Sequence, residues 1–305
     1  MTAAVLRSRQ AAVGRPVALL CLLFGAEQAL AEGAAARSAS ALPDGVLTLP
    51  APGSEMVRIP RGPVVLGSTA DEVLAAAASC ASEPLAHRCS EQTFANELGR
   101  HSRVLPEFFI DRIEVSVAEY SRCVSLGRCA EPPYAEGSER LRRTELPVVL
   151  VTWEEARAYC RFRNARLPSE AEFERAARGN AGEIFPWGNL YHARAANHGR
   201  LAVMPNDESD GYAELAPVWA FAAGKSRHGV LNLAGNAAEW QDDIYRERYT
   251  DPEPDPNQTA RRVVRGGSFL SAAAWLRGAA RVGLPPSARR TDLGFRCARS
   301  AESGR

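Results

Sequence analysis

Cysteine placement constrains the fold of this 305-residue chain more than any other feature. Cys21 lies inside an N-terminal apolar run that is expected to be removed from the mature protein. The other six cysteines therefore form an even set. In an exported protein an even set predicts disulfides, and six cysteines allow 15 pairings. Short separations favour two local pairs and leave a third that closes a long loop, namely Cys80–Cys89, Cys123–Cys129 and Cys160–Cys297. No C-x-x-C spacing is present, which argues against zinc.

The N-terminus matches a secretory signal peptide. Three arginines precede the apolar stretch PVALLCLLFG, and small residues at Ala29 and Ala31 follow it. We expect a signal peptide over residues 1–31 and a flexible lead-in rich in Ala, Ser and Pro over 32–50. A segment retained as a membrane anchor is the alternative, although the apolar run is short for a span. The chain is therefore expected to be periplasmic or secreted. Its arginine- and alanine-rich composition suggests a bacterial source.

Composition narrows the possible partners. The net charge is +1, which gives no electrostatic reason to bind nucleic acid or an anionic membrane. Apolar residues make up 46% of the chain, enough for a substantial core. We expect a monomer that stays off the membrane once the signal is removed.

Local patterns place several elements. Alternating residues over 56–68 predict a strand and a turn, and residues 69–100 read as an insertion with an Ala-rich helix. The stretch from Phe108 begins as a strand and becomes helical. Two S/T-x-x-E capping boxes, Thr152 with Glu155 and Ser169 with Glu172, predict helix starts, and Gly179 predicts a helix end. Residues 180–260 are rich in loops, and we expect a covalent cross-link, a metal ion or a closely packed partner segment to keep them ordered.

Six motifs appear in an order that resembles one family. They are PVVLVTWEEARAYC, RLPSEAEFERAARG, FPWGN, LNLAGNAAEW, VVRGGSF and LGFRCA. The chain resembles the formylglycine-generating enzymes, or sulfatase-modifying factors, over residues 51–300. The resemblance implies one α+β domain related to C-type lectin folds, with little regular structure. It also implies a disulfide between Cys160 and Cys297.

The resemblance also implies calcium, which prefers carboxylate, amide and carbonyl oxygens. One group would use the side chains of Asn232 and Glu239 with the carbonyls of Gly235 and Ala237. A second group would use the side chains of Asn197 and Asp210 with the carbonyls of His198 and Tyr212. Turn formation alone is the competing explanation for these residues. The calcium is expected to stabilise the fold rather than to do chemistry.

The thiols that the family needs for catalysis are missing. Active members oxidise a substrate cysteine with a copper ion held by two cysteines that follow the R-G-G-S motif. The matching positions here are Ser271 and Leu276, and residues 266–296 contain no cysteine. Soft thiolates select monovalent copper, and a hydroxyl cannot replace them. Copper binding is therefore not expected, and Ala238, where the family commonly has a large aromatic residue, suggests a remodelled pocket.

Three functions remain open. The first is a calcium-stabilised binding or accessory module for a peptide, glycan or partner protein. The second is a periplasmic enzyme of altered chemistry, like the cysteine-less relatives that assist siderophore maturation. The third is a sulfatase-activating oxidase with an unexpected mechanism. The candidate cleft residues are Arg265, Ser268, Trp275 and Arg281. The G-G-S sequence is not the G-x-S-x-G of a serine hydrolase.

Overall fold

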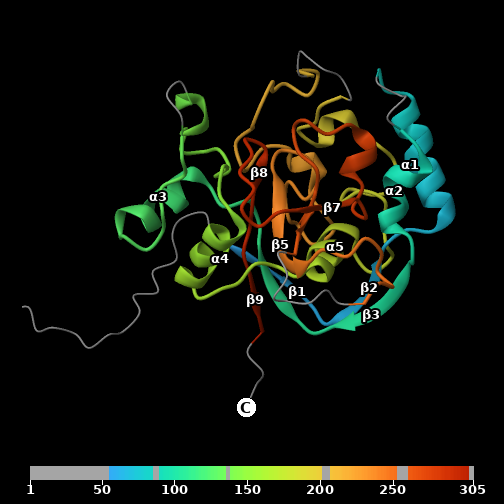
Figure 1. Ribbon diagram of the computed structural model, residues 1–305, viewed down its shortest axis with the longest axis horizontal. Coiled ribbons are helices and arrows are strands. Elements are labelled where there is room, and N and C mark those ends of the chain that lie inside the picture. The colour runs from blue at the N-terminus through green and yellow to red at the C-terminus, as the bar shows by residue number, and fades with distance from the viewer. Residues whose placement is uncertain (1–54, 85–88, 135–137, 201–206, 253–259, 302–305) are drawn as a thin grey trace, which may run out of the picture. The chain divides into compact units, whose positions relative to one another are not determined.

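The computed structural model describes residues 55–84, 89–134, 138–200, 207–252 and 260–301. The predicted signal peptide and lead-in lie outside these residues. Short helices and strands are joined by long loops, which confirms the α+β prediction (Figure 1). Within the described residues, no helix has the length and apolar character needed to cross a membrane.

The strands form three small sheets. In the first, β4 (Phe108–Asp111) lies between β1 (Met56–Ile59) and β9 (Ala298–Ser300), antiparallel to both. The second pairs β2 (Gly62–Leu66) with β3 (His101–Leu105). The segment predicted as one strand over 56–68 is thus two strands in different sheets, because Pro60 falls between them and has no N–H to offer a ladder.

The third sheet carries the candidate site. Its order is β7 (Arg281–Leu284), β6 (Arg262–Arg265), β5 (Ala238–Ile244) and β8 (Leu293–Gly294). The β5–β8 pair is parallel and the other pairs are antiparallel. This register places Arg265 beside Glu239 on one strand and beside Arg281 on the other.

Capping boxes begin the main helices, as the sequence predicts. Thr152 caps α4 (Trp153–Phe162), Ser169 caps α5 (Glu170–Arg178), and Gly179 ends α5. The same device begins α1 (Ala70–Ala81) and α3 (Val117–Ser125). The remaining helices are one turn each: α2 (Glu91–Phe94), η2 (Ala95–Glu97), η3 (Glu139–Leu141), η4 (Ala193–Ala195), η5 (Ala222–Gly224) and η6 (Ala273–Leu276).

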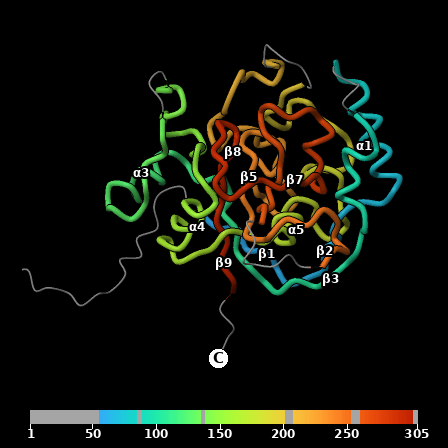
Figure 2. Tube along the Cα trace, in the orientation of Figure 1, coloured from blue at the N-terminus to red at the C-terminus, as the bar shows by residue number. Residues whose placement is uncertain are grey.

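Helix α5 is the central helix of the described domain. All nine of its residues are buried, although five of them are charged. It packs against β2 and also against β5 and β6, while α1 and α2 lie on one flank and α3 and α4 on the other (Figures 1 and 2). A helix this polar can be buried only if its charges find partners in the protein.

The three expected disulfides are present. Cys80–Cys89 closes the end of α1, and Cys123–Cys129 closes the end of α3. Cys160–Cys297 joins α4 to the segment before β9 and spans 137 residues of sequence. Both of its cysteines lie in the largest apolar cluster, beside Tyr159 and Phe295.

We expect the long-range disulfide to contribute most to stability. Loop closure in the unfolded chain predicts a loss of about 5 kcal/mol for Cys160→Ala with Cys297→Ala, but only about 2 kcal/mol for Cys123→Ala with Cys129→Ala. Urea unfolding of the two double variants against the parent measures the difference. Equal losses would show that the native contacts around the sulfurs, rather than loop length, set the effect.

Candidate functional site

The R-G-G-S turn follows β6 and depends on its two glycines. Gly266 and Gly267 have φ of 91° and 68°, which disfavours other residues. A side chain at Gly267 would also bring its Cβ to 2.8 Å from the carbonyl oxygen of Trp275. The turn therefore sits directly on η6, and its shape cannot change without moving that segment.

A pocket of about 200 Å³ opens beside this turn. We call it the turn pocket. Its walls are mostly apolar, with hydroxyl and guanidinium groups at intervals. The side chains and backbone that line it are Ala238, Val264, Arg265, Gly267, Ser268, Ser271, Trp275, Ala280, Arg281, Val282, Leu284, Arg290, Asp292 and Leu293.

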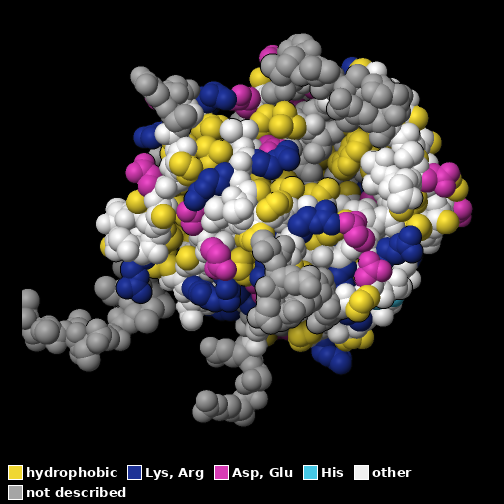
Figure 3. Space-filling view, in the orientation of Figure 1, with side chains coloured by type: hydrophobic (Ala, Val, Ile, Leu, Met, Phe, Trp, Pro, Cys, Tyr) yellow, Lys and Arg dark blue, Asp and Glu magenta, His cyan; other side chains and the backbone are white. Residues whose placement is uncertain are grey.

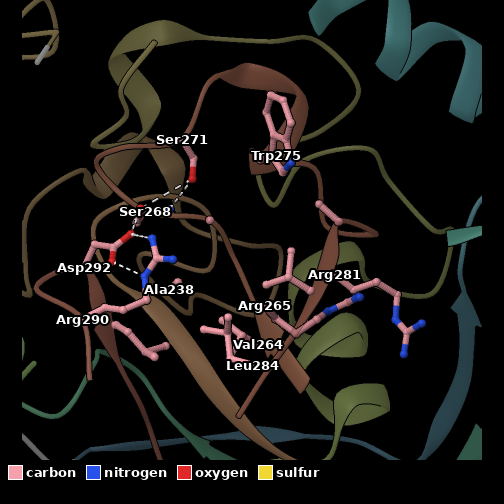
Figure 4. Close-up of a pocket in the computed structure, with 14 residues that line it drawn as sticks. Ala238, Val264, Arg265, Ser268, Ser271, Trp275, Arg281, Leu284, Arg290 and Asp292 are labelled. Carbon is pink, nitrogen blue, oxygen red and sulfur yellow. Dashed lines mark hydrogen bonds and ion pairs between the residues drawn. The ribbon is translucent and has the colours of Figure 1, made fainter. Parts of the chain in front are cut away.

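A hydrogen-bonded chain forms one side of the turn pocket (Figure 4). Ser268 donates its hydroxyl proton to Asp292 Oδ2 at 2.8 Å, and its backbone N–H donates to Ser271 Oγ at 2.9 Å. Arg290 binds both oxygens of Asp292, at 2.7 and 2.9 Å. Asp292 is the sole carboxylate among the described residues that line this pocket, and it is fully engaged.

The two arginines on the other side of the turn pocket, Arg265 and Arg281, form buried ion pairs that stabilise the fold. Arg265 Nη2 donates to Glu174 Oε2 at 2.5 Å and to the carbonyl of Gly278 at 2.7 Å. Arg281 binds both oxygens of Glu170, at 2.6 and 3.0 Å. Burial alone would raise the pKa of Glu170, but Arg281 and Arg265 hold it below the ordinary value. Both arginines thus line the turn pocket, as the sequence suggests, with their charges already paired.

Ser271 and Leu276 both lie close to Gly267. A Cβ built at Gly267 would lie 3.2 Å from Ser271 Cβ and 3.1 Å from Leu276 Cδ2. Ser271 faces the turn pocket, whereas Leu276 is fully buried in a small apolar cluster with Phe185 and Ala234. The scaffold brings together the two positions that would carry thiols in the family, but it offers a hydroxyl and a hydrocarbon.

The loops that carry the expected calcium ligands are joined to the turn. Gly235 passes so close to Asn197 that a Cβ there would lie 2.1 Å from the Asn197 carbonyl oxygen. Asn236 N–H donates to that carbonyl, and Gly235 N–H donates to the carbonyl of Gly266. Gly199 N–H donates to the carbonyl of Ser271. The sequence did not indicate that these segments meet.

The Asn197 group offers oxygens that fit a cation. Asn197 Oδ1 is buried without a hydrogen-bond partner among the described residues. Among the described residues, Asp210 accepts hydrogen bonds from backbone N–H groups, those of His198 at 2.7 Å and Tyr212 at 2.9 Å. An unpaired amide oxygen near a carboxylate matches the donor chemistry that calcium prefers. No set of three His, Cys, Asp or Glu side chains in the described part of the chain could hold a metal, so amides and carbonyls would have to supply the rest.

The Asn232 group fits a cation less well. Both carboxylate oxygens of Glu239 accept from Arg296, at 2.6 and 2.7 Å, and both side chains are buried. The Asn232 side-chain amide donates to Glu114 at 2.9 Å. A cation bound at Glu239 would lie beside a guanidinium group, which is electrostatically unfavourable. This arrangement favours the Asn197 group over the Asn232 group.

Glu114 is the residue that sequence reasoning missed. It is fully buried and accepts N–H groups from Asn232, Asn236 and the backbone of Ala237. Burial, followed by the nearby Glu239 carboxylate, raises the pKa of Glu114 to about 8. It therefore organises the loop from Asn232 to Ala237. The residue stands more than 100 positions away along the chain, so no local pattern could have signalled it.

The turn, its pocket and the surrounding loops define a sulfatase-modifying-factor scaffold. A family model, the sulfatase-modifying factor enzyme 1-like domain, matches residues 46–301, and the chain belongs to this family. It is 38% identical over 176 residues to the inactive C-alpha-formylglycine-generating enzyme 2 of Mus musculus, covering 55% of this chain and 54% of that protein. It is 35% identical over 190 residues to the formylglycine-generating enzyme of Streptomyces coelicolor, covering 56% and 58%. The chain thus spans about half the length of these relatives.

Solved structures support the fold. PvdO from Pseudomonas aeruginosa superposes with a TM-score of 0.62 at 23% identity, covering 81% of this chain and 94% of that one. Treponema denticola variable protein 1 gives 0.57 at 20% identity, covering 81% and 95%. These likenesses concern the fold alone.

Restoring both thiols tests whether the scaffold still holds the copper geometry. We expect Ser271→Cys with Leu276→Cys to bind one copper(I) ion tightly, because both positions pack against Gly267. Each single variant should bind much more weakly, and a competition titration with a copper(I) chelator measures all three. Equal affinity of the double and single variants would show that these positions do not converge closely enough.

Calcium removal tests the Asn197 group. A chelator should lower the melting temperature of the parent, since binding at 100 times Kd stabilises by about 2.7 kcal/mol. Asp210→Asn should abolish most of this response. Glu208→Gln, an exposed change two residues away, should retain it. If the chelator left the melting temperature of the parent unchanged, the prediction of a calcium site at the Asn197 group would be wrong.

Proposed function

We propose that this protein is an exported binding or accessory module of the sulfatase-modifying factor family that does not generate formylglycine by copper chemistry. The main observation that supports this proposal is that Ser271 places a hydroxyl, rather than a thiol, at the turn pocket. The six cysteines of the described residues are all in disulfides, so none of them could hold copper(I).

The relatives are consistent with this proposal but do not decide it. The mouse protein named as inactive and the bovine formylglycine-generating enzyme are similarly close, at 38% and 34% identity. Overall similarity therefore cannot separate an active member from an inactive one. The proposal therefore depends on the residues at the turn, Ser271 and Leu276, to distinguish an inactive member from an active one.

Binding fits the turn pocket better than acid–base catalysis. Its one described carboxylate, Asp292, is held by Arg290 and Ser268, so no free base faces the pocket. The apolar wall formed by Val264, Leu284 and Leu293 suits one apolar side chain of a peptide or partner protein. The Ser271 hydroxyl is placed to hydrogen-bond with the polypeptide that carries that side chain.

Export and calcium complete the proposal. Three disulfides in one domain are typical of an oxidising compartment such as the periplasm or the extracellular space. Mixed surface charge argues for a protein or peptide partner rather than nucleic acid: on the face in Figure 3, basic and acidic side chains alternate with hydrophobic ones. Calcium at the Asn197 group would stabilise the loops behind the turn.

Two measurements on the mature protein test this function. Incubation with copper(I) and a cysteine-containing sulfatase peptide should leave the peptide mass unchanged, and capture from the periplasm of the source cell should retain a specific partner. Val282 lies exposed on the pocket rim, so Val282→Arg should reduce capture at least fivefold, whereas Val104→Arg, an exposed change on β3, should not. Formylglycine in the peptide, or equal capture by both variants, would overturn the proposal.

A further inference from the structure

A second and larger cavity, of about 390 Å³, lies on the flank of the domain. We call it the α1 cavity. Helix α1 forms one wall through Ala75, Ala76 and Ser79, and the segment from Ile184 to Tyr191 forms another. Ala273 and Ala274 of η6 close the third side. Helix η6 therefore lies between the turn pocket and the α1 cavity, because its Trp275 lines the turn pocket while its alanines line the α1 cavity.

The floor of the α1 cavity is apolar and its arginines are neutralised. Phe185, Ala76 and Ala274 are buried on the lining. Arg178 donates to Glu174 at 2.7 Å, and Arg277 binds both oxygens of Glu97, at 2.8 and 2.6 Å. These two guanidinium groups are almost fully buried, so neither is free to attract an anion.

The charge that reaches solvent on the lining is acidic. Asp71 is exposed in the first turn of α1, and no described residue pairs with it. Glu72, beside it, keeps 22% of its side chain exposed while it binds Arg100. On the wall formed by the segment from Ile184 to Tyr191, Tyr191 leaves 41% of its surface exposed. Burial, and then the nearby carboxylates of Glu83, Asp207 and Asp210, raise the pKa of Tyr191 to about 12.

We propose that the α1 cavity is a second ligand site, which binds a small primary amine with an aromatic or branched apolar body. The ammonium group would lie at the mouth between Asp71 and the ring of Tyr191, where a carboxylate and an aromatic face both favour a cation. The apolar body would replace water against Phe185 and the alanines. The volume lies within the range of cavities that hold small molecules.

This site shares helix η6 with the turn pocket as a common wall, but the two share no lining residue. It uses α1, which belongs to the segment that reads as an insertion, and none of the residues at the R-G-G-S turn. Its failure would leave the proposed function of the turn pocket unaffected, and the reverse also holds.

Phenethylamine is the test ligand, because it combines a phenyl ring with a primary ammonium group. Isothermal titration or ligand-observed NMR with the parent should give saturable binding with a Kd of about 1 mM or below. The alcohol 2-phenylethanol keeps the ring without the charge, and phenylacetate reverses the charge. Both should bind at least fivefold more weakly. Equal binding of the amine and the alcohol, or no binding of the amine, would overturn the proposal.

Matched variants place the ligand in the cavity. Ala75→Trp should abolish binding because it fills the cavity, whereas Ala78→Trp, an exposed change on the same helix outside the lining, should not. Asp71→Asn should weaken binding about fivefold while keeping the shape of the mouth. Val282→Trp at the rim of the turn pocket should leave amine binding unchanged. Loss of binding in Val282→Trp, or its retention in Ala75→Trp, would show that the amine binds elsewhere.

Discussion

The buried contact between Arg265 and Glu174 is the constraint on which the functional region depends. Arg265 lies at the end of β6 with 1% of its surface exposed, and its guanidinium group joins α5 to the carbonyls of Gly278 and Ala279. Glu174 also binds Arg178 and the N–H of Gly67, so one carboxylate connects three parts of the chain. Removing one partner of such a pair typically costs about 3–5 kcal/mol, because the other charge remains buried.

This network shows that the fold around the turn does not depend on thiols at positions 271 and 276. The charges of Arg265 and Arg281 are matched by Glu170 and Glu174, with no contribution from Ser271 or Leu276. The glycines of the turn are held by backbone contacts with η6 and with the loop at Gly235. The paired charges and the turn glycines therefore do not require thiols at positions 271 and 276, although Leu276 itself is fully buried among apolar residues.

Local features of the fold were predictable, and contacts over long separations were not. The capping boxes at Thr152 and Ser169 signal α4 and α5 because the interacting groups lie three residues apart. The three disulfides followed from counting and spacing. By contrast, the pairing of Arg296 with Glu239 and the role of Glu114 arise only when distant segments meet, and they alter the expected chemistry at Asn232. The α1 cavity, likewise, needs three separate segments.

The residues at positions 271 and 276 also affect how the chain acquires its disulfides. Two additional cysteines at the turn would raise the number of cysteines in the described residues from six to eight, and with it the possible pairings from 15 to 105. Two of the native disulfides close short loops that can form early, at the ends of α1 and α3. Once they have formed, Cys160 and Cys297 are the only cysteines left to pair among the described residues. A domain with Ser271 and Leu276 therefore has fewer alternative pairings to exclude during oxidative folding than the same domain with cysteines at these two positions.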